Sequence, residues 1–451
     1  MLEKTYISCG GVDKDLDNTE IEELFSSALS NAIADVNSSG KVVILPPDIT
    51  RYHSQAGFIT EIASRQLSNI QNKDKLGAIL PALGTHMAMN DEEIKYMFGS
   101  TPRDKFIVHD WRNDIAELGR IEEDWVEKTS EGAVRYDWPV QVNKILHKNN
   151  PSSGDFSLTL SIGQVVPHEV AGMANHAKNL FVGTGGKEAI DKSHFIGAAY
   201  GMERIMGKAD TPVRALFDEG LKRFGSELPP ILWVLTVISA RTLVEASLNG
   251  KEPGTLAVRG LYIGFGRECF EKAAKLSREV NVNLMDEPVK KAVVYLEPQE
   301  YRTTWLGNKA VYRTRMVIAD GGELVVLAPA LERFGEDKGI DALIRKHGYR
   351  PAKEILSKVA NDRELGQNLS AAAHLIHGSS ENRFTIRYCP GKKVTRKEIE
   401  AAGFEWGDIK EMQERYDISK LSPGWNTHSD GENFFYVPNP ALGLWAEKSK
   451  F

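Results

Sequence analysis

The stretch FSLTLSIGQVVPH, residues 156–168, decides the fold that this sequence predicts. Apolar side chains stand at every second position from Phe156 to Ile162, with small polar residues between them, which is the period of a buried strand. The segment then passes through a proline and ends at His168. A strand that ends in this way carries a histidine to the edge of a sheet, where ligands bind in α/β proteins.

Two earlier segments repeat this pattern. The segment KVVILPPD (41–48) predicts a buried strand that runs into a loop, and KLGAILPALGTH (75–86) predicts a buried strand that ends at His86. A helix is predicted between them, over residues 57–68. Because strand, loop and helix recur in this order, the segments favour a mainly parallel sheet with helices on its faces.

Two capping boxes predict where helices begin. Thr19 with Glu22 opens an apolar stripe at helical spacing, and Asn90 with Glu93 opens another. In each pair the two side chains would bond backbone N–H groups of the first turn, which no carbonyl within the helix can reach. We therefore expect one helix to start at each box.

A second α/β region makes up the C-terminal part of the chain. Strands are predicted over 290–298 and 323–329, with a helix between them over 301–315. The expected fold is α/β, with two domains that each have a mainly parallel sheet flanked by helices, and with the active site between them. We place the N-terminal catalytic domain at residues 1–284 and the C-terminal domain, expected to close over the site, at 285–451.

Length and composition are those of an ordinary globular protein. The 451 residues exceed what a single core supports, which agrees with two domains. The net charge of −6 lacks the basic excess of a nucleic-acid-binding protein. Three scattered cysteines predict no disulfide framework, the N-terminus shows no signal peptide, and the most apolar run, Ile231 to Ile238, is too short to span a bilayer. We expect a cytoplasmic protein that binds neither nucleic acid nor a membrane.

Polar side chains follow each of the three predicted N-terminal strands. Asp48, Thr50 and Arg51 come after the first, His86 after the second and His168 after the third. Because the carboxyl ends of parallel strands meet at one edge of a sheet, these residues are expected to lie close together. Histidine suits proton transfer near neutral pH, so two of them at one edge could serve opposite faces of one substrate carbon.

The densest cluster of reactive residues lies in VVPHEVAGMANHAKNLFVGTGGKEAIDKSH, residues 165–194. Its glycines match neither the P-loop nor the dinucleotide-binding spacing, so a standard ATP or NAD site is not supported. Lys178 could bind a phosphate or form a covalent adduct with a carbonyl-derived cofactor, and an imidazole such as that of His194 could bind a metal. Each residue alone is most simply a surface or packing residue; their coincidence is what indicates a site.

Four motifs in order resemble a known family. PDITR (47–51), GTH (84–86), PHEVAGMANHAKN (167–179) and SH (193–194) are similar to motifs of the nickel-dependent lactate racemases and their 2-hydroxyacid racemase and epimerase relatives. The resemblance covers most of the N-terminal region, while the C-terminal half matches more loosely, chiefly around Lys309. It implies an isomerase that inverts the C2 stereocentre of a 2-hydroxy acid.

The resemblance also implies a cofactor. The family uses a covalently bound nickel-pincer nucleotide, pyridinium-3-thioamide-5-thiocarboxylic acid mononucleotide with nickel, which accepts and returns the C2 hydride. Carried over to this sequence, Lys178 would bear the cofactor and His194 would be the protein ligand to nickel, while His86 and His168 would be the two acid–base residues. Cofactor-maturation proteins are then expected partners, besides the small-molecule substrate.

Four further residues are assigned by the same resemblance. Asp48, Thr50 and Arg51 would line the cofactor or the substrate, and Lys309 would be a candidate for binding the cofactor or the substrate carboxylate. These assignments rest on motif position and not on spacing or periodicity.

The sequence departs from the family pattern near these motifs. His53 stands after Arg51 and Tyr52, where proline is common, and Asn175 with His176 stand before Lys178, where small residues are usual. The added hydrogen-bonding groups would suit a longer, polyhydroxylated acid such as an aldonate better than lactate.

Three other readings stay open. A zinc or iron hydrolase could use His86, His168 and His194 as ligands, although the sequence lacks the carboxylate-and-histidine spacing of common zinc sites. A non-catalytic carrier of the nickel cofactor would need Lys178 and His194 but not two acid–base histidines. A plain α/β protein with scattered histidines would need none of them.

Overall fold

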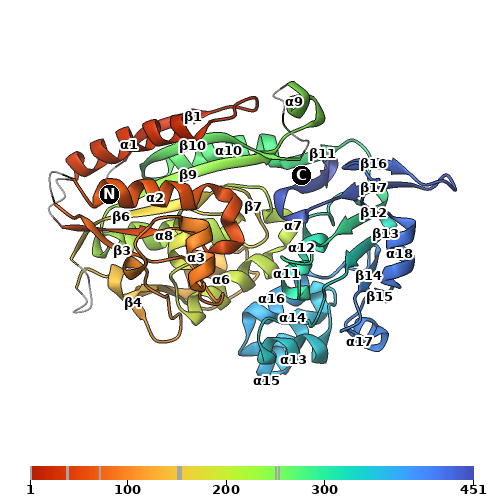
Figure 1. Cartoon of the computed structure of the whole chain (residues 1–451). Helices are drawn as coiled ribbons and strands as arrows, with labels where there is room; N and C mark the ends of the chain where they lie inside the picture. The colour runs from red at the N-terminus through yellow and green to blue at the C-terminus, as the bar shows by residue number, and fades with distance from the viewer. Residues whose placement is uncertain (1–2, 37–39, 71–72, 150–154, 249–250, 252–253) are drawn as a thin grey trace. The chain divides into compact units, whose positions relative to one another are not determined.

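The computed structural model describes residues 3–36, 40–70, 73–149, 155–248, 251 and 254–451 (Figure 1). The chain divides into two compact units. The first consists of residues 1–193 and 206–281, and the second of residues 194–205 and 282–451. Each unit contains its own six-stranded sheet, so each is an α/β unit in its own right.

The sheet of the first unit is mixed and mainly parallel. Its order is β1-β10-β9-β6-β2-β3, in which β2, β3, β6 and β9 run parallel and β1 and β10 are antiparallel to their neighbours. The strands are β1 (Lys4–Gly10), β2 (Lys41–Leu45), β3 (Leu76–Ile79), β6 (Phe156–Gln164), β9 (Ile231–Ala240) and β10 (Leu256–Phe265). The three predicted N-terminal strands are therefore confirmed as neighbours in one sheet.

The second of these strands is shorter than predicted. β3 ends at Ile79, and Pro81, which has no N–H to donate, follows two residues later. Beyond it the backbone N–H of Ala82 donates to Pro46 O, and that of Gly84 donates to Gly183 O. His86 is consequently presented by a loop that other segments hold in place, and not by a strand end.

Helices cover both faces of this sheet (Figure 1). Buried residues of α1, α2 and α3 share one apolar core with the strands, while α10 packs against β1, β9 and β10. Neighbouring strand residues point to opposite faces, so Leu261 joins the first core whereas Tyr262 lies on the side of Leu276 in α10. The helices of this unit are α1 (Asn18–Asp35), α2 (Ala56–Leu67), α3 (Asp91–Phe98), α4 (Glu123–Thr129), α5 (Ala177–Phe181), α8 (Pro212–Phe224), α9 (Leu243–Leu248) and α10 (Glu268–Asn281).

One capping box is confirmed and the other is wrong. Asn90 and Glu93 cap α3 reciprocally, as predicted. Helix α1 instead starts after Asp17, whose side chain accepts from the backbone of Glu20 while Glu20 caps Asp17 in return. The box therefore lies two residues earlier than the Thr19 pair, because an aspartate fills the cap position equally well.

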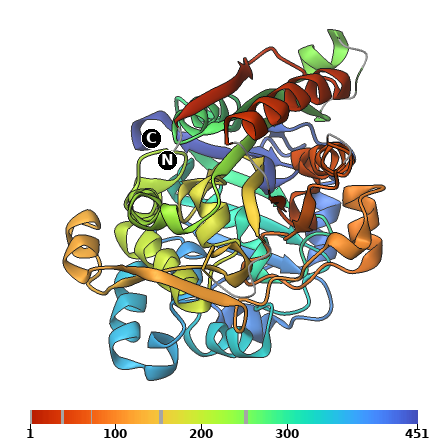
Figure 2. The same ribbon diagram turned by 90° about the vertical axis from the view of Figure 1, so that its left-hand side faces the viewer.

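Two small antiparallel pairs complete the first unit. β4 (Ile115–Ile121) pairs with β5 (Trp138–Asn143), and Figure 2 shows β4 as a long orange strand next to α4. β7 (Pro167–His168) pairs with β8 (Gly172–Met173), with His168 opposite Gly172. The second pair is a tight hairpin that fixes the backbone around His168.

The second unit repeats the mainly parallel arrangement. Its sheet has the order β15-β14-β13-β12-β17-β16, and only β16 is antiparallel to its neighbour. The strands are β12 (Val289–Tyr295), β13 (Ile318–Ala328), β14 (Thr385–Pro390), β15 (Glu405–Trp406), β16 (Gly424–Thr427) and β17 (Asn433–Val437), and β11 (Val282–Met285) pairs with β18 (Leu444–Glu447). The strands predicted over 290–298 and 323–329 are confirmed.

The prediction of one continuous helix over 301–315 is wrong. The segment forms two short helices, α11 (Thr304–Gly307) and α12 (Lys309–Tyr312), interrupted at Asn308. The other helices of this unit are α13 (Lys338–His347), α14 (Ala352–Asn361), α15 (Arg363–Gly366), α16 (Leu369–His377), α17 (Arg396–Ala401) and α18 (Ile409–Arg415).

A single boundary at residue 285 does not separate the two units, because residues 194–205 belong with the second one. This segment holds the end of α6 (Lys187–Tyr200) and all of α7 (Met202–Ile205). In α7, Glu203 forms an ion pair of 2.6 Å with Arg315, whose side chain is almost fully buried and also donates to the carbonyl of Ile376. A buried cation with a carboxylate partner ties the segment to the second unit.

All three cysteines are free thiols, and Cys269 and Cys389 are buried. Burial raises the pKa of each of these two thiols to about 12, so both stay protonated at neutral pH. In the part of the chain that the structure describes, no helix combines the length and the apolar character needed to cross a membrane.

Candidate active site

Asp48 and His86 form a hydrogen-bonded pair. Asp48 follows β2 and caps a short 3₁₀ helix, Ile49–Ser54, where its Oδ1 accepts from the backbone N (3.2 Å) and the hydroxyl (2.6 Å) of Thr50. Its Oδ2 lies 2.6 Å from Nδ1 of His86. The aspartate is 4% exposed, whereas the His86 side chain is 44% exposed. The carboxylate thus holds one edge of the imidazole and leaves the other edge accessible.

The Asp48 carboxylate is ionised at neutral pH. Burial by itself would raise the pKa of Asp48, but His86, the Thr50 hydroxyl and the charge of Arg51 together lower it to about 2. An ionised carboxylate can only accept hydrogen bonds, so Nδ1 of His86 carries the shared proton. Nε2 of a neutral His86 then has the lone pair that a general base requires.

His168 is held differently. It is 6% exposed and lies in the β7–β8 hairpin. The backbone N–H of Val170 donates to its Nδ1 at 3.1 Å, and Oε2 of Glu169 lies 3.9 Å from the same atom. The hairpin itself therefore fixes the orientation of this ring.

Lys178 is a partly buried amine with an altered pKa. Burial, followed by the positive charges of Arg51 and Arg214, lowers the pKa of Lys178 to about 8 against the opposing effect of Glu169 and Asp48. No described residue forms a hydrogen bond or an ion pair with its Nζ. An amine with this pKa is neutral in roughly a tenth of the molecules at pH 7, far more than an ordinary lysine, which favours it as a nucleophile.

Arg51 is a second cation beside Lys178. Its backbone departs from helical geometry, with φ −117° and ψ 27°, inside the 3₁₀ segment that Asp48 caps. Within the described ranges, no residue accepts a hydrogen bond from its guanidinium. Two cations that act on one another and that form no ion pair with a described carboxylate favour an anionic ligand.

A strained turn precedes Lys178. Asn175 and His176 both have positive φ values, 66° and 55°, a conformation that costs roughly 1–2 kcal/mol for a residue with a side chain. The His176 ring packs 4.2 Å from Trp233 and 5.1 Å from Phe270 between ring centroids, and its Nε2 donates to the carbonyl of Gly266 at 3.2 Å. His176 therefore anchors the turn in an aromatic core.

Arg214 stabilises the same turn and is the residue that sequence reasoning missed. Its guanidinium donates to the carbonyls of Asn175 (3.2 Å) and Met173 (2.6 Å) and lies 4.3 Å from the Phe270 ring. Burial lowers the pKa of Arg214 to about 10, so it remains a cation. The available signal was its place beside Val213 on the apolar face of α8, a position where arginine is unusual.

The remaining predicted residues lie in the second unit. His194 is part of α6, and Lys309 is the first residue of α12. The amine of Lys309 lies 3.8 Å from Oε1 of Glu300 and 5.3 Å from the centre of the Tyr301 ring. The structure thus brings Asp48, Thr50, Arg51, His86 and Lys178 together within the first unit.

The described residues include no group of three histidine, cysteine, aspartate or glutamate side chains placed to hold a metal ion. A protein-only zinc or iron centre, as the hydrolase reading requires, is therefore not supported by the described part of the chain.

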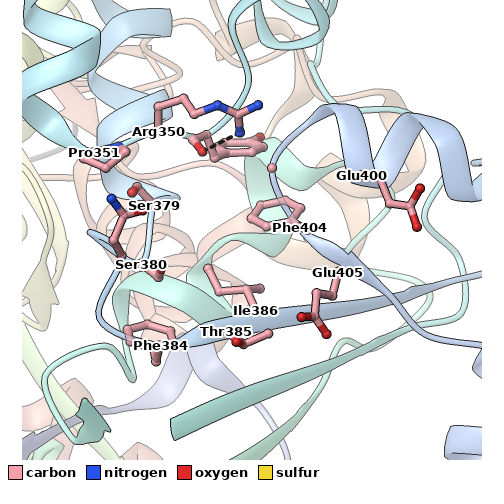
Figure 3. A pocket seen from close by; sticks show the side chains of 13 residues that line it. Arg350, Pro351, Ser379, Ser380, Phe384, Thr385, Ile386, Glu400, Phe404 and Glu405 are labelled. Carbon is pink, nitrogen blue, oxygen red and sulfur yellow. Dashed lines mark hydrogen bonds between the residues drawn. The ribbon is translucent and has the colours of Figure 1, made fainter. Parts of the chain in front are cut away.

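The second unit has a pocket of its own, of about 430 Å³ (Figure 3). Arg350, Glu400 and Glu405 contribute charged side chains to its wall, and Phe384 and Phe404 contribute aromatic ones. None of the residues predicted for the active site lines it. It is a separate feature of the second unit.

Two solved structures resemble this chain in fold. Over 97% of this chain and all of the other, the structure superposes on a crystal structure of a Thermotoga maritima protein with a TM-score of 0.77 and 22% identity. It also matches the lactate racemase apoprotein from Thermoanaerobacterium thermosaccharolyticum with a TM-score of 0.67 and 15% identity, covering 96% and 94% of the two chains. The chain is an α/β protein with the lactate racemase-like fold.

A family model matches part of the sequence. Residues 12–204 match the model of the lactate racemase N-terminal domain. No curated protein matches the chain. The resemblance expected from the four motifs is confirmed, and the matched residues include Asp48, His86, His168, Lys178 and His194.

Proposed function

We propose that this protein is a racemase or epimerase that inverts the C2 stereocentre of a 2-hydroxy acid with a nickel-pincer nucleotide. The observation that carries the proposal is Lys178, an amine without a described partner and with a pKa lowered to about 8, close to the Asp48–His86 pair. A carrier of the cofactor would need Lys178 and His194 but no acid–base histidine, so the carboxylate-held His86 is the feature that favours catalysis.

The residues present fit the cofactor. Lys178 would hold it covalently, and Arg51 would bind its phosphate or the substrate carboxylate, since both cations lack a described acceptor. The resemblance assigns His194 as the protein ligand to nickel and Lys309 as a residue that would bind an anionic group. When bound, the cofactor supplies an electron sink that accepts and returns the C2 hydride.

The protein's own residues move the hydroxyl proton. Nε2 of His86 takes the proton from the substrate hydroxyl, and Asp48 stabilises the imidazolium that results, as a carboxylate does for a histidine base. His168 faces the other enantiomer and supplies the proton when the ketone is reduced from its opposite side. Two histidines are needed because the two C2 configurations present their hydroxyls in different directions.

The substrate is proposed to be longer than lactate, such as an aldonate. Three departures from the family pattern suggested this, and His176 no longer supports it because its ring packs against Trp233 and Phe270. His53 and Asn175 remain as the polar residues that distinguish the segments around Arg51 and Lys178. Assays across lactate, malate, 2-hydroxyglutarate and gluconate test the idea, and turnover of lactate alone would contradict it.

Intact-mass analysis tests the cofactor. Full-length protein is produced together with cofactor-making enzymes and compared with the Lys178→Ala variant. The expected result is a stable adduct on the peptide that contains Lys178, absent in the variant, together with nickel in elemental analysis. Zinc or iron without an adduct would favour the hydrolase, and an adduct without turnover of any 2-hydroxy acid would favour the carrier.

A further inference from the structure

The two acid–base histidines differ in the group that contacts Nδ1. In His86 this atom faces Oδ2 of Asp48 at 2.6 Å, and in His168 it faces the backbone N–H of Val170 at 3.1 Å. A carboxylate that is ionised can only accept a hydrogen bond, and a backbone N–H can only donate one. The first contact requires a proton on Nδ1, and the second requires a lone pair there.

We infer that His86 and His168 are held in opposite tautomers, with the proton of neutral His86 on Nδ1 and that of neutral His168 on Nε2. The inference deepens the proposed function and rests on it for its catalytic meaning. Nε2 of His86 has a lone pair and takes a substrate proton directly. Nε2 of His168 already carries a proton, so it donates a hydrogen bond to a substrate oxygen and cannot act as a base in this arrangement.

Protonation of the His168 ring to an imidazolium requires the β7–β8 hairpin to move. To deliver a full proton from Nε2, the ring must first be an imidazolium, which carries N–H groups on both nitrogens. An Nδ1–H would face the Val170 N–H, donor against donor, so this hydrogen bond must break and Nδ1 must turn toward Oε2 of Glu169, which lies 3.9 Å away. The turn is short, since His168 pairs with Gly172 only four residues later, and the ring is 6% exposed. Proton transfer at His168 is therefore coupled to a rearrangement of the turn, whereas transfer at His86 is not.

The ratio kcat/KM cannot reveal this asymmetry where substrate and product are enantiomers. Enantiomers are equally stable, so kcat/KM must be the same in both directions whatever the two histidines do. The tautomers themselves have to be observed. Long-range proton–nitrogen NMR correlation distinguishes a protonated from an unprotonated ring nitrogen, and it needs neither cofactor nor substrate.

The experiment uses the full chain with ¹⁵N-labelled histidine, free of cofactor, at a pH where both rings are neutral. Signals of the two residues among the 11 histidines are identified by their loss in His86→Gln and His168→Gln. We expect Nδ1–H for His86 and Nε2–H for His168. The same tautomer at both positions, or Nδ1–H at His168, would overturn the inference.

Asp48→Asn is the matched variant for this measurement. An amide can donate to Nδ1 as well as accept from it, so His86 is expected to lose its pure Nδ1–H state while His168 keeps its signals. An unchanged His86 would overturn the assignment to Asp48. Because the protein is cofactor-free, these results hold or fail independently of turnover. Correct tautomers with no turnover of any 2-hydroxy acid would contradict the proposed function alone.

Discussion

Lys178 and Lys291 show how two similar α/β units treat a partly buried lysine in opposite ways. In β12 of the second unit, burial alone would lower the pKa of Lys291, but the carboxylates of Glu432 and Glu323 outweigh it and raise the pKa. In the first unit, the charges of Arg51 and Arg214 act in the same direction as burial, and the pKa of Lys178 falls to about 8. The structural lysine forms ion pairs with two carboxylates, whereas the candidate functional lysine forms no ion pair with a described residue, and burial with two cations outweighs the charges of Glu169 and Asp48.

The largest effect is expected from replacing Lys178, the residue on which the comparison of the two units depends. Lys178→Met should abolish the covalent adduct and all racemase activity, because no other described amine of the first unit's site can replace it. Lys291→Met should leave the adduct intact and instead cost about 1–3 kcal/mol of unfolding free energy, the range for hydrogen bonds to charged groups. Intact mass and urea unfolding measure the two outcomes. An adduct that survives Lys178→Met would refute the role of this lysine.

Asp48→Asn is expected to have the next largest effect. The variant keeps the shape of the side chain but no longer stabilises a His86 imidazolium, so kcat should fall roughly 10²- to 10⁴-fold. The Lys178 adduct should remain. Thr50→Val removes only the hydroxyl donor to the same carboxylate, and a fall of about tenfold or less is expected from the loss of one hydrogen bond. Equal losses in both variants would argue against a specific role for the Asp48–His86 contact.

The strands of both sheets could be predicted from periodicity. In a buried strand the apolar residues either alternate with polar ones or form a short continuous run. The positions of His86 and His168 after strands were also predicted. The exact presentation of His86 was not, because Pro81 ends β3 early and the loop is held by backbone bonds to Pro46 and Gly183. Such bonds join distant segments and leave no local pattern.

The parts of the site that depend on three-dimensional contacts were missed for the same reason. Asp48 was assigned to the cofactor or substrate, and the bonds of its carboxylate to His86 and Thr50 were not predicted. His176 was read as a substrate contact, whereas aromatic rings enclose it. The role of Arg214 depends on carbonyl groups that lie about 40 residues earlier in the chain. The partners of these side chains are set by the fold and leave no local pattern in the sequence.

Arg214→Lys tests the comparison by removing the guanidinium that supports the Lys178 segment. Lysine keeps the charge but cannot donate to two carbonyls in the fixed geometry of a guanidinium, so the strained turn should loosen. We expect a loss of about 1–3 kcal/mol in unfolding free energy and several-fold slower adduct formation. Arg223→Lys on the same helix is the control, because its ion pairs with Glu122 and Glu219 are at the surface and should contribute less than about 1 kcal/mol. Equal losses would mean that the turn does not depend on Arg214.

The smallest expected effect is a difference in pH dependence between the two lysines. Only a neutral amine reacts with an acylating reagent, so the labelling rate follows the deprotonated fraction. With a pKa of about 8, Lys178 should react about tenfold faster at pH 9 than at pH 7, whereas a lysine near its ordinary pKa gains about a hundredfold. Lys291, whose pKa is raised, should show the steeper rise from a lower starting rate. Short labelling followed by peptide mass spectrometry measures both residues in one sample. A hundredfold rise at Lys178 would show that burial and the neighbouring cations do not lower its pKa, and the contrast between the two units would then lose its electrostatic basis.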